Sequence, residues 1–249
     1  MANVDEATMD VSPVFSPLYQ QIKALLLQSL EQGEWNAGEM IPSEVDLAVR
    51  YKVSQGTVRK AIDELTSEKL LVRRQGRGTF VATHQEPVNR FRFLRMRHND
   101  DAEFKTYSNV LDVVEAVPPA LVRERLQLKA NEPAVVISRL LSFEDEPAVF
   151  EYIWLPKLIF TDVTLEKLVN YKGGLYGWFE AEYNVRMIRA VEHLSAQLAN
   201  SEVAQKLEIA PNSAVLYIER VSYTYADQPV EVRLGWYSTQ HYHYRNELI

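Results

Sequence analysis

The sequence predicts an α+β protein in which an N-terminal winged helix-turn-helix precedes a domain built on an antiparallel sheet. Three observations support this prediction: apolar residues at helical spacing before residue 70, an Arg- and Gly-rich hairpin at 72–81, and a pattern of strands and short helices that occurs twice after residue 110. Strand pairs with attached helices are typical of α+β domains. We place the first domain at 14–83, a linker at 84–106 and the second domain at 107–249.

The first domain contains three amphipathic segments. In 16–32, Ser16 is the expected N-cap, and leucines and an isoleucine follow at helical spacing. A second helix is expected to start after the cap Ser43, and a third, capped by Ser54, to run to about Lys69. Two helices joined by a short turn form a helix-turn-helix motif.

Basic residues concentrate in this domain although the whole chain is acidic. The chain has a formal net charge of −7, yet residues 42–83 contain eight Lys or Arg against five Asp or Glu. A basic block within an acidic chain is typical of a protein that binds a polyanion. A solvated charged face would have the same composition, so the positions of the charges must decide between the two interpretations.

The third helix places polar residues where a recognition helix contacts DNA. The N-terminal residues of such a helix reach base edges in the major groove. Arg59 can donate two hydrogen bonds to guanine, and Gln55 can pair with adenine. Gly56 permits close approach, while the hydroxyls of Ser54 and Thr57 suit phosphate oxygens. With the preceding cap and the hairpin, the predicted DNA-binding set is Ser43, Ser54, Gln55, Gly56, Thr57, Arg59, Lys60, Arg73, Arg74, Gln75, Gly76, Arg77, Gly78 and Thr79.

The hairpin after the third helix is the predicted wing. Its sequence, VRRQGRGTFV, has strand-like ends and a GRG turn that tolerates positive φ. The arginines near the tip would lie along a phosphate backbone or enter the minor groove. The helix and the hairpin together favour DNA binding over a merely solvated face.

These motifs, in this order, resemble the N-terminal domain of GntR-family bacterial transcription regulators. The segments PLYQQIKALLLQSLEQGEW, IPSEVDLAVRYKVSQGTVRKAIDEL and LLVRRQGRGTFVA carry the resemblance, which extends over 17–82. It implies a transcription regulator, most simply a repressor, that binds a double-stranded DNA operator. Relatives usually carry Arg in place of Val45 and often Arg in place of Gln55, so the family's usual operator sequence does not carry over. One module makes too few contacts for operator affinity, so we expect a homodimer.

The second domain contains two copies of one pattern. Each copy has a strand, a short helix (119–127 and 201–207), a polar turn and two further strands. A helical segment broken at Gly173-Gly174 separates the copies. Corresponding positions are Pro133 and Asn212, Arg139 and Arg220, Pro147 and Pro229, and Glu151 and Glu231.

This duplicated pattern resembles the UTRA effector-binding domain of the HutC-type branch of the GntR family, over roughly 107–245. The resemblance implies a chorismate-lyase-like fold and an effector cleft lined by Arg139, Glu151, Gly174, Tyr176, Glu231 and Tyr237. Relatives that bind sugar phosphates often carry a second Arg where Leu141 stands and Ser where Gly174 stands. They also have an R-x-D-R pattern where this chain has Ser238, Gln240 and His241. Among small polar effectors, including sugar-like ones, we therefore expect a carboxylate or amino-bearing metabolite rather than a sugar phosphate.

The alternating stretch 90–97 within the linker suggests a strand packed on one face. Its arginines, at 90, 92, 95 and 97, could instead contact DNA.

Several classes of site are excluded or left without support. The chain has no cysteine, which removes disulfides, thiolate metal sites and cysteine nucleophiles. No signal peptide is recognisable, and no window approaches the ~18 apolar residues of a membrane span, so we expect a cytoplasmic protein with no membrane partner. Because no phosphate loop, nucleophile elbow or zinc-protease motif occurs, we assign no catalytic residue, metal or cofactor. Two alternatives stay open: an enzyme acting on a small carboxylate, and a metal held by His241, His243 and a carboxylate.

Overall fold

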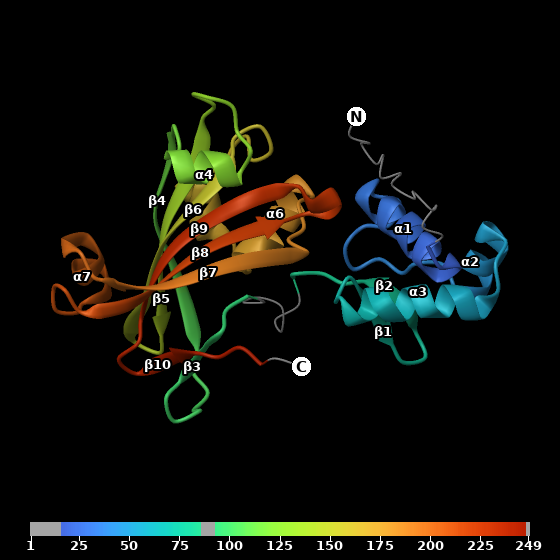
Figure 1. Cartoon of the computed structure of the whole chain (residues 1–249), viewed down its shortest axis with the longest axis horizontal. Coiled ribbons are helices and arrows are strands. Elements are labelled where there is room, and N and C mark those ends of the chain that lie inside the picture. Colours follow the sequence, from blue (N-terminus) through green and yellow to red (C-terminus); the bar gives the residue numbers. More distant parts are fainter. Residues whose placement is uncertain (1–15, 86–92, 248–249) are drawn as a thin grey trace, which may run out of the picture. The chain divides into compact units, whose positions relative to one another are not determined.

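The computed structural model describes residues 16–85 and 93–247 (Figure 1). The chain divides into two compact units, residues 1–82 and residues 83–249, each with its own core. Residues 14 and 15 of the predicted first domain lie outside the described residues, as do residues 86–92 of the predicted linker.

The first unit is a three-helix domain with a hairpin. Helix α3 packs against both α1 and α2. Its predicted inward face is confirmed, since Val58, Ala61, Ile62 and Leu65 are all fully buried. The elements are α1 Leu18–Glu31, α2 Glu44–Tyr51, α3 Gln55–Ser67, β1 Leu71–Arg74 and β2 Gly78–Val81.

Two of the three predicted helix caps are confirmed and one is wrong. The hydroxyls of Ser43 and Ser54 each accept a hydrogen bond, at 3.2 Å, from the backbone N–H three residues later. Ser16 does not cap α1, because the helix begins one residue later than expected and Pro17 occupies the N-cap position. The side-chain oxygen of an N-cap residue accepts from the N–H of the second or third helical residue. Ser16 precedes the N-cap position by one residue and does not make this bond.

The hairpin β1–β2 is the predicted wing. Its antiparallel register ends at the pair Arg74 and Gly78. The turn requires a left-handed backbone at Gly76 (φ +68°) and Gly78 (φ +110°), which glycine adopts without strain. A bridge from Met40 to Phe80 adds a further short segment beside β2. The first unit is therefore a winged helix-turn-helix.

The second unit is built on one six-stranded antiparallel sheet, in the order β4-β5-β6-β9-β8-β7 (Figure 1). The first sequence copy supplies β4 to β6 and the second supplies β7 to β9, so the copies meet at β6 and β9 and their first strands form the two edges. The duplicated sequence pattern is therefore a structural repeat. The strands are β4 Thr106–Ala116, β5 Ala134–Phe143, β6 Glu146–Pro156, β7 Arg189–Leu198, β8 Ala214–Tyr223 and β9 Pro229–Ser238.

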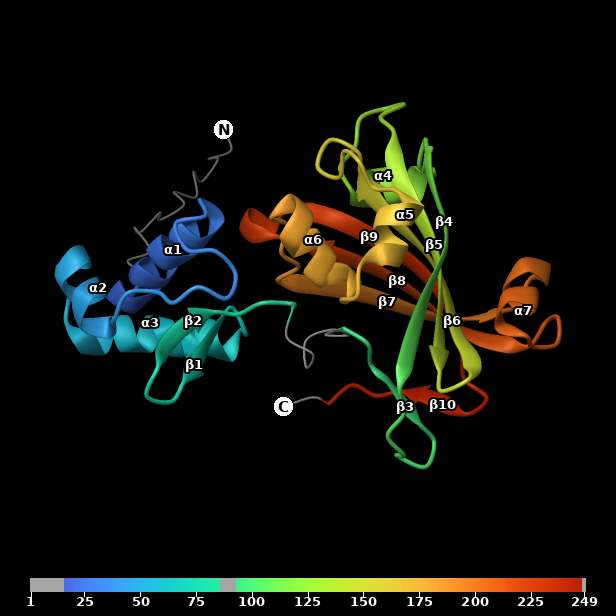
Figure 2. The ribbon, with the colours of Figure 1, turned by 180° about the vertical axis from the view of Figure 1, so that it is seen from behind.

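Helices cover both faces of this sheet. Helices α4 and α7 belong to cores on one face, and α5 and α6 pack on the other, which is turned to the viewer in Figure 2. The predicted break at Gly173-Gly174 separates α5 from α6. The remaining elements are α4 Ala120–Arg125, α5 Leu165–Asn170, α6 Leu175–Tyr183, α7 Ser201–Leu207, the 3₁₀ turn η2 Tyr225–Asp227, and the paired strands β3 Met96–His98 and β10 Tyr242–Tyr244.

The prediction of a strand over 90–97 is wrong for residues 93–95, which are described and are not part of a strand. Residues 90–92 lie outside the described residues, and β3 begins only at Met96. The carbonyl of Phe93 bonds the side chain of Arg220 instead of a neighbouring strand. A side-chain partner thus replaces the ladder that the alternation suggested.

Candidate functional site

One carboxylate joins the recognition helix to the wing in the first unit. Glu44, at the start of α2, accepts hydrogen bonds from Arg59 Nε at 2.9 Å and from Gln55 Nε2 at 3.3 Å. Its other oxygen accepts from Arg73 Nη2 of β1 at 3.0 Å. Three predicted DNA-binding side chains therefore meet at Glu44, which the sequence analysis did not single out.

The other predicted DNA-binding residues have different surroundings. The ammonium of Lys60 lies 3.8 Å from the ring centroid of Tyr19 on α1, so Lys60 is not part of the group at Glu44. The guanidinium of Arg74 lies 4.5 Å from the ring centroid of Phe80. The wing residues Gln75, Gly76, Arg77 and Gly78 are exposed, and Thr79 is half-buried. The hydroxyls of Ser43, Ser54 and Thr57 take part in helix capping.

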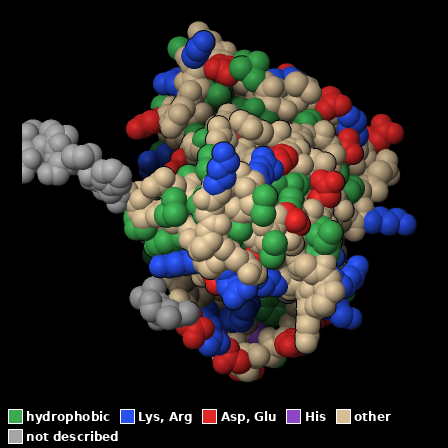
Figure 3. Space-filling model, turned by 90° about the vertical axis from the view of Figure 1, so that its right-hand side faces the viewer, with side chains coloured by type: hydrophobic (Ala, Val, Ile, Leu, Met, Phe, Trp, Pro, Cys, Tyr) green, Lys and Arg blue, Asp and Glu red, His purple; other side chains and the backbone are tan. Residues whose placement is uncertain are grey.

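Positive and negative side chains are mixed on one face of the molecule, where Lys and Arg side chains are interspersed with Asp and Glu side chains (Figure 3). The net charge of −7 agrees with this distribution. Because the whole chain is acidic, a nucleic-acid contact depends on where particular basic side chains are placed.

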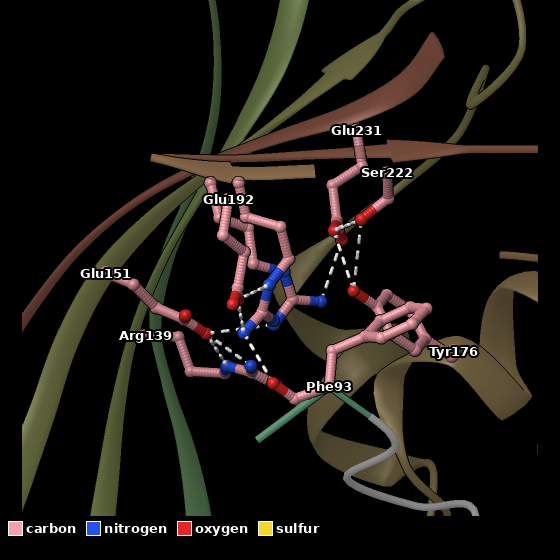
Figure 4. A network of polar contacts seen from close by, with 9 residues as sticks. Phe93, Arg139, Glu151, Tyr176, Glu192, Ser222 and Glu231 are labelled. Atoms are coloured by element: carbon pink, nitrogen blue, oxygen red, sulfur yellow. Dashed lines mark hydrogen bonds and ion pairs between the residues drawn. The ribbon is translucent and has the colours of Figure 1, made fainter. Parts of the chain in front are cut away.

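The second unit contains a cluster of buried charges on the α6 face of its sheet (Figure 4). Arg139 on β5, Glu151 on β6, Arg220 on β8, and Glu231 and Arg233 on β9 are each at most 5% exposed. The register places Arg139 directly opposite Glu151, and Arg220 opposite Arg233. Four neighbouring strands thus bring ionic side chains to a position where apolar residues would normally pack.

Every guanidinium in this cluster bonds a carboxylate. Arg139 Nε donates to Glu151 Oε1 at 2.7 Å, and Arg233 Nη1 donates to the same oxygen at 3.2 Å. Arg233 Nη2 donates to Glu231 Oε2 at 2.7 Å. These contacts meet the requirement that buried charges be paired.

The third pair reaches the edge of the sheet. Arg220 Nε donates to Glu192 Oε1 on β7 at 2.6 Å. Together with the two pairs above, three guanidiniums face three carboxylates. Within the described part of the chain, the cluster is therefore balanced in charge.

Helix α6 adds a phenol to the cluster. The hydroxyl of Tyr176 donates to Glu231 Oε1 at 2.9 Å, and Ser222 Oγ donates to the same oxygen at 2.8 Å. The guanidinium carbon of Arg233 lies 4.8 Å from the Tyr176 ring centroid. Burial raises the pKa of Tyr176, so its phenol is a protonated donor at neutral pH.

Glu151 lies among three positively charged neighbours. Burial alone would raise the pKa of Glu151, but the guanidiniums of Arg139, Arg233 and Arg220 outweigh it and hold that pKa below its ordinary value. Glu151 is therefore ionised throughout the neutral range.

A small cavity lies at this cluster. Its volume is about 30 Å³, which is room for about two water molecules. The buried Nε of Arg233 has no acceptor among the described residues, so the wall presents an unused donor. A second cavity of about 150 Å³ shares Arg139 and Leu175 with the first. The first is lined by Phe93, Leu94, Arg139, Leu141, Glu151, Leu175, Tyr176, Arg220, Arg233 and Tyr237.

The structure brings together most of the residues predicted from sequence for the effector cleft. Arg139, Glu151, Tyr176 and Tyr237 line the first cavity. Glu231 lies in the hydrogen-bonded network, and Gly174 is the N-cap of α6 and not part of the cavity wall.

Three residues were missed by the prediction. Arg220 was recognised only as the counterpart of Arg139 in the repeat. Arg233 shares a strand face with Glu231 two residues earlier, a period-two signal that could have identified it. No signal in the sequence identifies Phe93, because its contact with Arg220 joins residues 127 positions apart in the second unit.

Neither a metal centre nor a membrane span emerges from the described residues. Within 16–85 and 93–247, no three His, Asp or Glu side chains form a group that could hold a metal ion. His241 contacts Glu146 and His243 contacts Asn99. In the same ranges, every helix is too short or too polar to cross a bilayer.

Comparison with protein families decides the classification. Residues 18–81 match the model of the gntR family of bacterial regulatory proteins, and residues 101–243 match the UTRA domain. The chain belongs to the GntR family. It is a bacterial transcription regulator with a helix-turn-helix DNA-binding domain and a UTRA effector-binding domain, as the sequence resemblance implied.

Individual relatives support this assignment along most of the chain. The HTH-type transcriptional regulator YurK of Bacillus subtilis is 28% identical over 223 residues, covering 86% of this chain and 88% of YurK. The mannosyl-D-glycerate transport/metabolism system repressor MngR of Escherichia coli is 26% identical over 211 residues, covering 84% of this chain and 85% of MngR.

A solved structure resembles the second unit more closely. It is a ligand-binding domain from Bordetella bronchiseptica, described as part of a GntR-family transcriptional regulator. It is 42% identical, with a TM-score of 0.61, and the match covers 63% of this chain and 98% of that domain. The family and its relatives point to transcription regulation, so the enzyme alternative has no support.

The lowered pKa of Glu151 makes the stability of the second unit depend on pH. A carboxylate with a lowered folded pKa contributes stability above its unfolded pKa of about 4.3, and this contribution is lost as pH falls through the folded pKa. We expect the melting temperature of the wild type to fall below about pH 4 and to fall less steeply in Glu151→Gln. Melting curves between pH 3 and 6 test this, and equal slopes for the two proteins would contradict it.

Proposed function

We propose that this regulator is a repressor that binds a two-fold symmetric operator as a homodimer and responds to a small polar metabolite. The observation that carries the DNA-binding part is the meeting of Gln55, Arg59 and Arg73 at Glu44. Because one carboxylate orients all three, the recognition helix and the wing present a fixed arrangement of donors. The repressor MngR among the relatives supports the sign of regulation. Binding to chromosomal DNA places the protein in the cytoplasm.

The recognition helix and the wing have different tasks in this proposal. Arg59 and Gln55 lie in the first turns of α3 and contact base edges in the major groove. Arg77, exposed at the tip of the wing, contacts phosphate. Base contacts set the operator sequence, whereas phosphate contacts set affinity and salt dependence.

Two substitutions separate these tasks. We expect Arg59→Ala to weaken operator binding by about 1–3 kcal/mol and to relax specificity at one base pair. Arg77→Ala should weaken specific and non-specific binding alike and lower the salt slope by about 1.

Fluorescence anisotropy at several salt concentrations measures both effects. Arg50→Ala is the matched control, since Arg50 on α2 pairs with Glu34 in the turn after α1 and is not among the predicted DNA contacts. Unchanged binding by both test variants would show that the helix and the wing are misassigned.

Strand β7 is the surface we propose for dimerisation. It is a ten-residue edge strand that pairs with β8 without a bulge. Its second half, LSAQL, carries no charge, and Leu194 and Leu198 are exposed. An edge of this kind pairs readily with another chain. The opposite edge, β4, has a bulge and two acidic residues and packs against α5, so it is less suited to pairing.

Charged substitutions on the two edges test this assignment. Leu194→Lys with Leu198→Lys should convert the dimer to a monomer at micromolar concentration, because an isologous interface repeats each new charge. Tyr107→Lys with Val114→Lys on β4 is the control and should leave the dimer intact. Light scattering coupled to gel filtration measures the mass. A wild-type chain that is monomeric with and without DNA would contradict the proposal, as would a dimer that survives the β7 changes.

The buried cluster is the proposed effector site, and its charge balance constrains the effector. A phosphate would add up to two uncompensated negative charges to a set that already balances, at a large desolvation cost. A metabolite with a carboxylate and an amino group adds no net charge. Its carboxylate would accept a hydrogen bond from Arg233 Nε, and its amino group would donate to a carboxylate such as that of Glu151. We therefore propose an effector of this zwitterionic type.

A thermal-shift screen tests the effector site. Amino acids and other small carboxylates should include a ligand that raises the melting temperature by about 2–4 °C or more, because binding to the native state alone stabilises it. Arg139→Met with Glu151→Gln should abolish the shift, since it removes a whole ion pair and leaves no buried unpaired charge. Arg125→Met with Glu219→Gln removes an ion pair on the opposite sheet face and should preserve it. A shift retained in the first double variant would contradict this placement.

A further inference from the structure

Phe93, which lies near the start of the second unit in the sequence, reaches into the proposed effector pocket (Figure 4). Its carbonyl oxygen accepts a hydrogen bond from Arg220 Nη2 at 2.8 Å. Its ring packs edge-on against Tyr176, with 5.7 Å between centroids, and lies 5.8 Å from the guanidinium carbon of Arg220. With Phe93 and Leu94 in place, the cavity of about 30 Å³ holds about two waters and no metabolite.

These contacts are the kind that a ligand makes. Phe93 offers a neutral acceptor to a buried guanidinium and an apolar surface to an aromatic ring. Among the described residues, the other hydrogen bonds given above for the cluster come from side chains of the sheet and of α6. The contact of Phe93 can therefore be exchanged for that of a ligand without breaking any of the three ion pairs.

The same helix contacts the beginning of this connecting segment. The ring of His84 lies 5.4 Å from that of Tyr176, and the backbone N–H of His84 donates to Glu180 at 3.1 Å. The hydroxyl of Thr83 also donates to Glu180. Tyr176 and Glu180 are four residues apart and share one face of α6.

Helix α6 is thus bonded to the chain very near its exit from the wing. Strand β2 ends at Val81, two residues before Thr83. Tyr176 contacts both His84 and Phe93, so one side chain of the pocket touches both ends of the segment 84–93.

Resting on the effector site proposed above, we propose that Phe93 holds the effector's place in the ligand-free protein. Beside its contact with Arg233, the effector offers an oxygen to Arg220 and an apolar portion to Tyr176, and so replaces both contacts of Phe93. The segment that leads to the wing then loses its attachment at Phe93. When the wings are held less firmly, fixing them on an operator costs more conformational entropy. Effector binding therefore lowers the affinity of the dimer for its operator.

The absence of cysteine from the chain allows a direct test without the effector. Leu141 lines the pocket and is 3% exposed, so Leu141→Cys gives a single buried thiol. Its rate of alkylation by iodoacetamide in the full-length native protein reports how often the pocket opens. We expect Phe93→Ala to raise this rate at least tenfold and Phe93→Leu, which keeps apolar bulk, to raise it less.

The matched control is Phe104→Ala in the same reporter background. The ring centroid of Phe104 lies 4.4 Å from that of Phe143, in the core cluster that also contains the reporter position Leu141, but Phe104 does not line the pocket. General loosening of the second unit would raise the alkylation rate equally in the Phe93 and Phe104 variants. That result, or no change with Phe93→Ala, would overturn the proposal.

A second measurement connects the pocket to DNA. In chains without the reporter cysteine, Phe93→Ala should raise the operator dissociation constant about tenfold, which corresponds to about 1.4 kcal/mol, whereas Phe104→Ala should not. If the wild type and Phe93→Ala bind the operator with equal affinity, the proposed role of Phe93 is overturned and the proposed function is not. Failure of the wild type to bind any operator would instead contradict the proposed function, so the two failures are distinguishable.

Discussion

The pairing of buried charges on one face of the sheet constrains much of the second unit. Three guanidiniums and three carboxylates come from five strands, and removing one partner of such a pair typically destabilises a protein by several kcal/mol. The strand register must therefore place Arg139 opposite Glu151 and Arg220 beside Glu192. Helix α6 is fixed by the same requirement, because Tyr176 donates to Glu231.

This balance gives the pocket its chemical character. A fully paired set of charges is a poor place for a further net charge and a good place for a ligand that brings an acceptor and a donor together. The contact between Arg220 and Phe93 is an example from within the chain. The site that favours a balanced ligand is thus also the site at which the connecting segment is attached.

The first unit uses a similar device on a smaller scale. Glu44 is a single carboxylate that bonds residues of α3 and of the wing, and its contacts are partly exposed to solvent. Such pairs contribute little to stability, at most about 1 kcal/mol each. Their importance is geometric, since they orient the side chains of Arg59 and Arg73 before DNA binds.

The sequence predicted the elements better than the contacts between them. Helical spacing found α3 and its buried face, and the repeat found the strand pairs that carry Arg139 and Glu151, because both signals are local in the chain. The cap at Ser16 was misplaced by one residue, since Pro17 already satisfies the backbone requirement of the N-cap.

Contacts between distant segments were out of reach of these patterns. The bond between Phe93 and Arg220 joins residues 127 positions apart and replaces the strand that alternation suggested. The convergence on Glu44 likewise depends on how α2, α3 and the wing pack together. Arg233 was accessible in principle, because it alternates with Glu231 on one strand face.

Hydrogen exchange of the full-length protein with and without its operator tests the central claim most directly. Coupling between two sites is reciprocal, so if Phe93 in its pocket favours DNA binding, DNA binding must favour Phe93 in its pocket. The account predicts slower amide exchange at Thr83, His84, Phe93 and Leu94 and in α6 when operator is bound. Protection confined to α3 and the wing, with no change at these residues, would contradict it.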